Sequence, residues 1–355
     1  MKKTILKEKH LTLGARMGEF GGWDMPIQYE GILAEHQQTR TASSLFDICH
    51  MGEFEISGST AEMDLERLLT CSIASLNVGQ VRYGYLLNEM GGVLDDLTVY
   101  RIDYDRFWLV VNAGTAAADA AWISRNLQQT TVFNDISDQI AKLDLQGPAS
   151  KSVLQDVYGC SFADLRYFRF QSLRDGWVSR TGYTGELGYE VYVPVDEAAA
   201  LWDSFLTHPK CAPAGLGARD TLRLEMGYPL YGHELDATHS PVETGDGMFI
   251  DWNKAFIGKA RCDADKLYGT QRVVGLQLAS KRAAREQDRV FYKNELVGYI
   301  TSGSVAPSLN VAVAMARLDG SCCEVGHQVE VEIRGRFQDA QVVSLPFYQS
   351  GSARV

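Results

Sequence analysis

The chain has 355 residues and lacks any stretch that approaches the roughly 20 consecutive apolar residues of a membrane-spanning helix. The first residues, from Met1 to Glu8, are basic but have no apolar core of the kind that marks a secretory signal. There is also no long basic run that could neutralise a row of phosphates, and the net charge is -11. These absences predict a soluble cytoplasmic protein that binds neither membrane nor nucleic acid.

Cysteine spacing excludes two further classes of protein. The seven cysteines are odd in number, and none forms a C-x-x-C pair. Neither a zinc site nor a disulfide framework is therefore indicated, and we expect reduced thiols and no metal centre. Hydrophobic residues make up 45% of the chain and charged residues 22%, an ordinary globular composition that can bury one or more large cores.

The first 270 residues alternate between short segments of strand and helix character. Strand patterns occupy Glu53–Ser57, Leu94–Tyr100 and Arg106–Val111. Thr60–Leu69 has the apolar spacing of an amphipathic helix, and Ala113–Leu127 is alanine-rich and helical in character. The mixture predicts an α+β architecture rather than a doubly wound parallel sheet.

The pattern changes after about residue 270, where short β candidates follow one another with turns between them. Such spacing is typical of a small β-barrel. We therefore predict one boundary near Gly269 and Thr270, with 1–270 and 271–355 as the two units. The β candidates are Val273–Leu278, Val297–Ser302, Val311–Leu318, Val329–Ile333 and Ala340–Ser344.

Two adjacent carboxylates follow a glycine pair in Gly91-Gly92-Val93-Leu94-Asp95-Asp96. Neighbouring side chains of a strand point to opposite faces, so one aspartate can face a pocket while the other faces solvent or caps the turn. The alternative is a polar turn before a strand, since aspartates are common in turns.

A glycine-rich loop occupies Arg180 to Gly188 and leads to Glu190 in an apolar strand. Three glycines within seven residues suggest a backbone that passes close to another group. A buried carboxylate needs a partner, and its two oxygens suit a flat ligand edge with adjacent N–H groups, such as a pterin or a guanine. A hairpin with an exposed glutamate is the alternative.

A third segment, Gly215 to Glu225, runs from Gly-x-Gly into a helix-like pattern. Arg219 falls near the start of this helix, where free backbone N–H groups favour anions. Asp220 can hold the guanidinium of Arg219 or cap the helix; a surface ion pair is the alternative.

Taken together, these segments and several others resemble the glycine cleavage system T-protein (aminomethyltransferase) family over nearly the whole chain. The matching strings lie in the order and spacing of that family. They are Phe20–Pro26, Phe46–Glu53, Gly91–Asp96, Leu145–Pro148, Arg180–Glu186, Gly215–Glu225, Tyr231–Asp236, Phe256–Lys259 and Pro346–Tyr348.

The resemblance implies a three-domain cloverleaf around a central folate channel, with a small β-barrel as the last domain. It also implies that an aminomethyl group on the lipoyl arm of the H protein loses ammonia. The one-carbon unit then passes to tetrahydrofolate and gives methylenetetrahydrofolate. A fixed carboxylate can stabilise the positive charge that builds on the transferred carbon and can relay a proton.

By residue matching, Asp96 resembles the essential catalytic carboxylate of the family, Glu190 the ligand of the pterin edge, and Arg219 the folate-site arginine. Other positions resemble those that line or close the folate pocket: Tyr83, Tyr100, Asn112, Tyr183 and Arg354. We interpret His50 and His233 as structural.

Three strings depart from the family pattern: Thr70–Ser72, Ala306–Asn310 and Gly245–Met248. The first bears on the identity of the one-carbon donor. A tetrahydrofolate-dependent S- or O-demethylase on the same fold is therefore an alternative. A non-catalytic folate-binding protein is another, although its Lys-Gly-Cys-Tyr-x-Gly-Gln-Glu string is missing.

The densest basic stretch, Lys281 to Arg285, lies in the expected barrel with Arg289 close by. A local basic patch of this kind can attract an acidic carrier in spite of the negative net charge. The alternatives are a docking surface for the H protein and a solvated turn.

Overall fold

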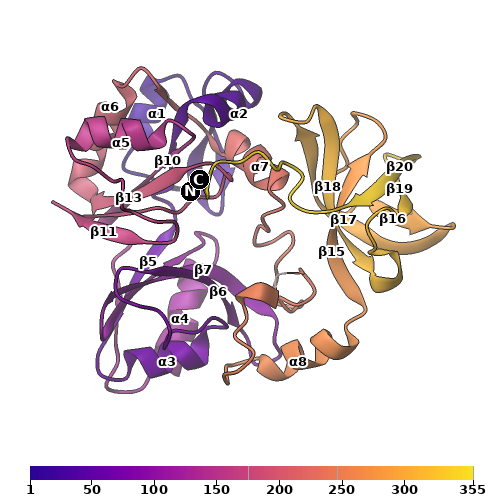
Figure 1. The fold of residues 1–355 in the computed structure, drawn as a ribbon, viewed down its shortest axis with the longest axis horizontal. Coiled ribbons are helices and arrows are strands. Elements are labelled where there is room, and N and C mark those ends of the chain that lie inside the picture. Colours follow the sequence, from indigo (N-terminus) through magenta and orange to yellow (C-terminus); the bar gives the residue numbers. More distant parts are fainter. Residues whose placement is uncertain (175, 246, 355) are drawn as a thin grey trace.

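The computed structural model describes residues 1–174, 176–245 and 247–354. Three bodies surround a common centre (Figure 1). Two combine helices with a sheet, the third is a closed barrel, and helix α7 (Leu216–Glu225) lies near the middle. The predicted α+β class, the three-part arrangement and the C-terminal barrel are confirmed.

The first body is built on a six-stranded sheet in the order β11-β12-β13-β10-β4-β14. Apolar side chains on one face of the sheet pack with those of its helices into a core that includes Leu143, Trp202 and Phe205. The strands are β4 (Ser43–Asp47), β10 (Ile140–Gln146), β11 (Phe170–Leu173), β12 (Gly176–Ser179), β13 (Gly188–Pro194) and β14 (Cys211–Pro213). The accompanying helices are α1 (Lys7–Thr12), α2 (Ile32–Thr41), α5 (Ser150–Tyr158), η1 (Val195–Glu197) and α6 (Ala198–Leu206).

The second body carries a five-stranded sheet in the order β6-β7-β8-β5-β9. Helices α3 (Ala61–Leu68) and α4 (Ala116–Asn126) contribute Leu65 and Ile123 to its core. The predicted helices and strands exist here; the strand Arg106–Val111 has the predicted ends, and the ends of the others are shifted by up to three residues. The strands are β5 (Gly52–Ser57), β6 (Val81–Leu87), β7 (Val93–Asp103), β8 (Arg106–Val111) and β9 (Val132–Asp135).

The barrel closes in the order β15-β18-β17-β16-β19-β20. Five of its strands cover the predicted β segments, whereas the sequence analysis missed β16, which is four residues long and carries a bulge between Val290 and Phe291. The strands are β15 (Gln271–Leu278), β16 (Arg289–Tyr292), β17 (Glu295–Ala306), β18 (Val311–Asp319), β19 (Gln328–Ile333) and β20 (Arg336–Val343).

A small sheet, a connecting helix and the C-terminal tail join these bodies. The tail returns from the barrel: Tyr348 N donates to Glu225 O at 2.9 Å, and Ala353 N donates to Gly185 O at 3.1 Å. It thereby fastens the barrel to α7 and to the glycine-rich loop. The remaining elements are β1 (Lys2–Lys3), β2 (Arg16–Phe20), β3 (Trp23–Gln28), η2 (Gly247–Phe249), α8 (Lys259–Tyr268) and η3 (Gly320–Cys322).

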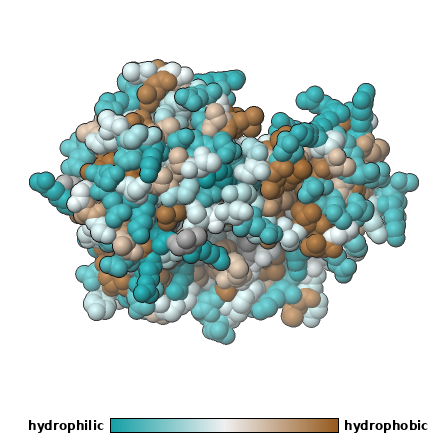
Figure 2. Space-filling model, turned by 45° about the horizontal axis from the view of Figure 1, so that its top comes forward, coloured by the Kyte–Doolittle hydropathy of each residue, from teal (hydrophilic) through white to brown (hydrophobic). Residues whose placement is uncertain are grey.

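The surface in Figure 2 is mostly hydrophilic, with hydrophobic residues in separate groups. Among the described residues, none of the helices combines the length and the apolar character that crossing a membrane requires. The seven cysteines, all of them in the described part of the chain, are free thiols.

Candidate active site

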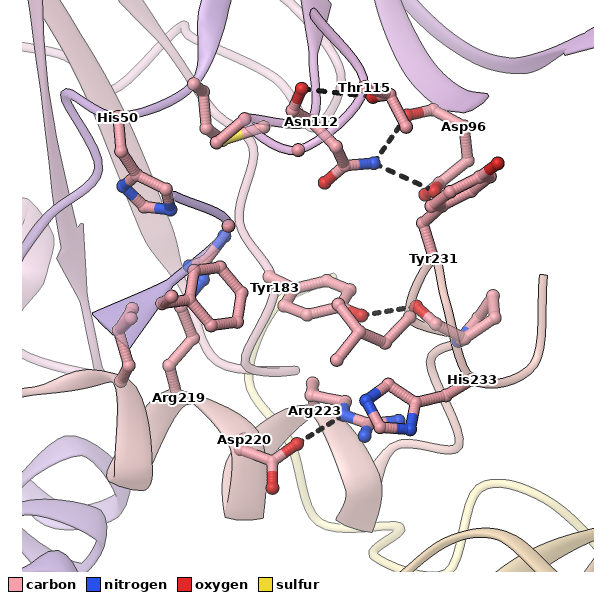
Figure 3. A pocket seen from close by; sticks show the side chains of 18 of the residues that line it. His50, Asp96, Asn112, Thr115, Tyr183, Arg219, Asp220, Arg223, Tyr231 and His233 are labelled. Carbon is pink, nitrogen blue, oxygen red and sulfur yellow. Dashed lines mark hydrogen bonds and ion pairs between the residues drawn. The ribbon is translucent and has the colours of Figure 1, made fainter. Parts of the chain in front are cut away.

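A cavity of about 760 Å³ lies where the three bodies meet. Small-molecule sites typically enclose about 300–1,000 Å³. In Figure 3, Asp96 and Asn112 lie on one wall, α7 with Arg219 lies opposite, and Tyr183 projects between them. The barrel contributes Arg285 and Gly303. The cavity therefore brings together segments that are far apart in the sequence.

Asp96 is held on its wall by two hydrogen bonds. Tyr83 Oη donates to Oδ2 at 2.9 Å, and Asn112 Nδ2 donates to Oδ1 at 3.0 Å. Burial and the neighbouring Asp95 raise the pKa of Asp96 to about 7, and the two hydrogen bonds oppose part of that rise. The carboxyl group is thus fixed in orientation and can exchange a proton near neutral pH.

Asp95 does not face solvent or cap the turn, so that part of the prediction is wrong. It is fully buried, accepts from Asn112 N at 2.9 Å and from Asn112 Nδ2 at 2.8 Å, and is hydrogen-bonded to Asp119 of α4. Strand alternation does separate the two aspartates, but the second face of β7 packs on protein rather than water. Burial and the facing Asp119 raise the pKa of Asp95 well above its ordinary value.

A further side of the cavity, next to Arg219, is formed by the polar face of β10 and β13. Lys142, Asp144 and Gln146 alternate with the core residues Ala141, Leu143 and Leu145. The antiparallel register sets Asp144 opposite Glu190 and Lys142 opposite Tyr192. Two strands therefore build a row of buried charges, because alternate side chains share one face.

Glu190 is buried and surrounded by donors. Its Oε2 accepts from the Thr181 hydroxyl and from Tyr100 Oη at 3.4 Å, while Oε1 faces Lys142 Nζ at 3.6 Å. Burial opposes ionisation, but Lys142, the Thr181 hydrogen bond and Arg219 outweigh it and hold the pKa of Glu190 below its ordinary value. Glu190 is therefore a carboxylate ready to accept N–H groups.

Arg219 projects from the first turns of α7 and pairs with Asp144, not with Asp220. Its Nη1 lies 2.6 Å from Asp144 Oδ2, and its guanidinium lies 4.9 Å from the centre of the Tyr183 ring. Asp220 instead accepts from Arg223 Nε at 2.8 Å. Of the roles considered for Asp220, holding Arg219 is wrong, because consecutive residues of a helix diverge, whereas residues three apart are neighbours. The alternative, an ion pair on the helix surface, describes Asp220 with Arg223.

The glycine-rich loop passes close to one side chain, as the sequence predicted. A Cβ atom at Gly182 or Gly188 would lie 2.2 or 2.0 Å from the amide of Gln146. That amide donates to Thr181 O at 3.1 Å and accepts from Thr184 Oγ1 at 2.7 Å. The absence of side chains at these two positions lets Gln146 fix the loop that carries Thr181 and Tyr183.

Residues 6–254 match the family model of the GCVT N-terminal domain, and residues 271–349 match that of the glycine cleavage T-protein C-terminal barrel domain. The chain belongs to the glycine cleavage T-protein family. An aminomethyltransferase of Symbiobacterium thermophilum is 42% identical over 100% of this chain and 99% of its own, and one of Geobacillus thermodenitrificans is 40% identical over 98% and 99%. The crystal structure of the glycine cleavage system aminomethyltransferase T from Bartonella henselae aligns with a TM-score of 0.95 at 34% identity, covering 99% of both chains.

Six of the eight residues assigned through the T-protein family line the cavity; they are Tyr83, Asp96, Asn112, Tyr183, Glu190 and Arg219. Tyr100 is not among the lining residues: it is buried behind Glu190 and contacts Tyr192 Oη at 2.8 Å. Arg354 is exposed, is also absent from the lining residues, and hydrogen-bonds Tyr167 at the tail.

Several residues of the cavity were not predicted from the sequence. Lys142 and Thr181 line it, and Asp144 lies beside them as the partner of Arg219. The alternation of polar and apolar residues from Ala141 to Gln146 is the signal that could have identified Lys142 and Asp144. His50 and His233 also line the cavity, and burial lowers the pKa of His50 to about 4.

The described residues of the three strings that depart from the family pattern are absent from the cavity lining. Thr70 and Cys71 are buried, and Cys71 belongs to the core of the second body. Ser308 N donates to Glu225 Oε1 at 2.8 Å, so this string joins the barrel to α7. In the third string, Asp246 lies outside the described residues. Within the described part of the chain, no group of three His, Cys, Asp or Glu side chains could hold a metal ion.

Proposed function

We propose that this chain transfers a one-carbon unit from the aminomethyl-lipoyl H protein to tetrahydrofolate, releasing ammonia and giving 5,10-methylenetetrahydrofolate. The observation that carries the proposal is a cavity with two differently tuned carboxyl groups. Glu190 is held ionised among donors, and Asp96 is poised near neutrality. The similarity of the whole chain to aminomethyltransferases supports it.

The residues present fit a folate. A pterin has adjacent N–H groups along one edge, and the Glu190 carboxylate has two oxygens to accept them. Tyr83 and Tyr183 supply aromatic surface, and Arg219 supplies a cation that is mostly covered but still lines the cavity. Tyr100 acts on the ligand only through Glu190, to which it donates a hydrogen bond. Arg354, in the C-terminal tail, is proposed to close the folate pocket. Bound tetrahydrofolate supplies the amine that receives the one-carbon unit.

Asp96 is the proposed catalytic residue. Loss of ammonia leaves positive charge on the transferred carbon, and a fixed carboxylate at that point stabilises the charge more in the transition state than in the ground state. Tyr83 and Asn112 hold the oxygens in place, so little reorganisation is needed. With a pKa of about 7, Asp96 can also take up the proton that the amine loses.

The H protein is the proposed donor partner, and the cytoplasm is the proposed location. The lipoyl arm must reach Asp96 through the cavity opening, where Arg285 and Glu286 of the barrel are lining residues. Contact with the carrier can remain small and polar, because the arm needs only a transient dock.

The test is a turnover assay with tetrahydrofolate and a panel of donors. Aminomethyl-loaded H protein should give ammonia and methylenetetrahydrofolate. Methylated sulfur and aromatic methyl-ether donors should give no methyltetrahydrofolate. Turnover with a methyl donor and none with the loaded carrier would replace the proposal with a demethylase, and binding of folate without any turnover would point to a non-catalytic folate protein.

A further inference from the structure

Lys142 carries a buried ammonium group whose N–H donors have only distant or weak acceptors among the described residues. Its side chain is 2% exposed. Nζ lies 3.6 Å from Glu190 Oε1, 3.7 Å from Met51 Sδ and 5.3 Å from the centre of the Tyr192 ring. A lysine has three N–H donors. Among the described residues, the polar side-chain atoms within 4 Å of Nζ are a carboxylate oxygen just outside hydrogen-bonding distance and a weak sulfur acceptor, while Glu53 and Asp144 act on the ammonium only through longer-range charge.

Such an arrangement is costly as structure alone. Burying a charge requires close pairing and satisfied hydrogen bonds to offset lost hydration. Arg219 shows the contrast, since it lies 2.6 Å from Asp144 and is thereby committed to a protein carboxylate. Lys142 lines the cavity, so its remaining donors can reach a ligand that sits against Glu190.

Glu190 and Lys142 together present acceptors next to a donor. The Glu190 carboxylate accepts two adjacent N–H groups, and the ammonium beside its Oε1 donates to an oxygen. A pterin edge carries that order of groups: the 2-amino group, the N3–H and the 4-oxo oxygen. The register places the two residues on neighbouring strands of one rigid sheet, diagonal to each other.

We propose that Lys142 is a specificity-determining residue that hydrogen-bonds the 4-oxo oxygen of the pterin and so selects oxo-pterins over 4-amino-pterins. The inference rests on the proposed function, because it assumes that Glu190 receives the pterin edge. Replacing the 4-oxo group by a 4-amino group turns the acceptor that faces Lys142 into a donor, and it also removes the N3–H that Glu190 accepts. Only the part of the preference that disappears when Lys142 is replaced therefore belongs to Lys142.

The test compares affinities for tetrahydrofolate and its 4-amino-4-deoxy counterpart, measured by calorimetry on the full chain. The wild type should prefer tetrahydrofolate by roughly tenfold or more, as one charged hydrogen bond against an unpaired donor implies. Lys142→Met keeps the length of the side chain and removes the ammonium. This variant should bind tetrahydrofolate more weakly, and its preference for tetrahydrofolate over the 4-amino ligand should fall by roughly tenfold or more. Lys151→Met, on α5 and not among the cavity residues, should match the wild type.

The outcomes separate this inference from the proposed function. If Lys142 only neutralises Glu190, its removal should weaken the binding of both ligands by the same factor. An unchanged preference between the two ligands would therefore overturn the inference and leave the folate-binding proposal intact. Absence of binding of either ligand to the wild type would instead overturn the proposed function. Equal affinities of the wild type for the two ligands overturn the inference. If Lys142→Met does not fold, Lys142→Leu takes its place, and a reduced preference supports the inference whereas an unchanged preference overturns it.

Discussion

At the scale of single residues, the site separates two carboxyl groups by their surroundings. Glu190 has hydroxyl and ammonium neighbours that favour its charge, whereas Asp96 has the carboxyl group of Asp95 behind it. Groups with pKa values pushed apart can take different roles within one cavity. One carboxylate can therefore bind while the other handles charge and protons.

Asp96→Asn should lower kcat far more than it weakens tetrahydrofolate binding. The amide keeps the size of the side chain and one acceptor oxygen but removes the charge that stabilises the transferred carbon. Steady-state kinetics with loaded carrier, together with calorimetry for folate, measures the two effects separately. Turnover at the wild-type rate in this variant would contradict the catalytic role of Asp96.

The pH dependence of kcat/KM should report the raised pKa of Asp96. Because the ionised form is the active one, activity should rise with pH through about 7 and fall roughly tenfold per unit below it. The residual activity of Asp96→Asn should lack this limb. An acid limb that stays in place in the variant would assign the titration to another group, such as Asp144, whose pKa burial raises to about 6.

Glu190→Ala should weaken tetrahydrofolate binding by roughly 1–3 kcal/mol, because the N–H groups of the ligand lose their acceptor inside the cavity. Calorimetry on the folded variant gives the number directly. The change also removes the counter-charge of Lys142, so thermal unfolding should be recorded alongside. Unchanged affinity in a folded variant would remove Glu190 from the folate site.

At the scale of elements, one pair of strands fixes the binding side of the cavity. β10 and β13 pair over seven residues, and the Gln146 side chain fills the space beside Gly182 and Gly188. That amide hydrogen-bonds Asp144, Thr181 and Thr184. The loop and the strand therefore act as one unit, and a side chain at Gly182 or Gly188 would collide with the Gln146 amide that holds them together.

Gly188→Ala should lower the free energy of unfolding by roughly 1–3 kcal/mol, because the added Cβ would lie 2.0 Å from the Gln146 amide. Chemical denaturation measures the loss. Gly114→Ala is the matched control for stability, since nothing lies within 4 Å of its Cβ position. Equal stability of the two variants would show that the Gln146 side chain can move away without cost.

Sequence patterns predicted helices and strands well where one face is apolar and the segment is long enough to show its periodicity. The helix at Thr60–Leu69 and the strand from Leu94 are present with shifted ends, and the strand Arg106–Val111 is present with the predicted ends. β16 was missed because four residues carry too little periodicity. The partner of Arg219 was not among the candidates considered, since Asp144 lies 75 residues away on another strand and only the tertiary register brings it there.

At the scale of the whole molecule, the cavity exists only because three bodies meet. α7 links the first body to the barrel, because it packs against α2 and β17. Its Arg223 contacts Glu234 Oε2 at 3.2 Å and Ser302 Oγ of the barrel at 2.9 Å. The tail adds a return contact to Glu225. We propose that residues 1–270 and 271–355 form the two domains of the chain. No local pattern could have placed the barrel beside Asp96, so the cavity itself followed from resemblance rather than from the residues alone.

The basic stretch on the barrel yields a prediction about the carrier. Arg289 is paired with Glu332 at 2.6 Å, whereas Lys281 contacts only the neutral Asn310 among the hydrogen bonds of the described residues, and Arg285 lines the cavity. Reversing Lys281 and Arg285 to Glu should raise the apparent KM for the H protein well above any change in the KM for folate. Added salt should weaken the wild type in the same direction.

Arg336→Glu provides the control for this experiment, because Arg336 is exposed on the same barrel but is absent from the cavity lining. It changes the net charge by the same amount per substitution. If the double reversal and the control show identical kinetics with the H protein at low salt, this basic stretch is not the docking surface. The transferase proposal would remain intact.

The central claim is that this cavity moves a one-carbon unit from the carrier to folate with loss of ammonia. The most direct measurement follows a ¹³C-labelled aminomethyl group on the lipoyl arm after mixing with enzyme and tetrahydrofolate, by nuclear magnetic resonance. The label should appear in the methylene carbon of methylenetetrahydrofolate, with one ammonia released per label transferred. A label that stays on the carrier, while a properly folded enzyme binds folate, would contradict the account.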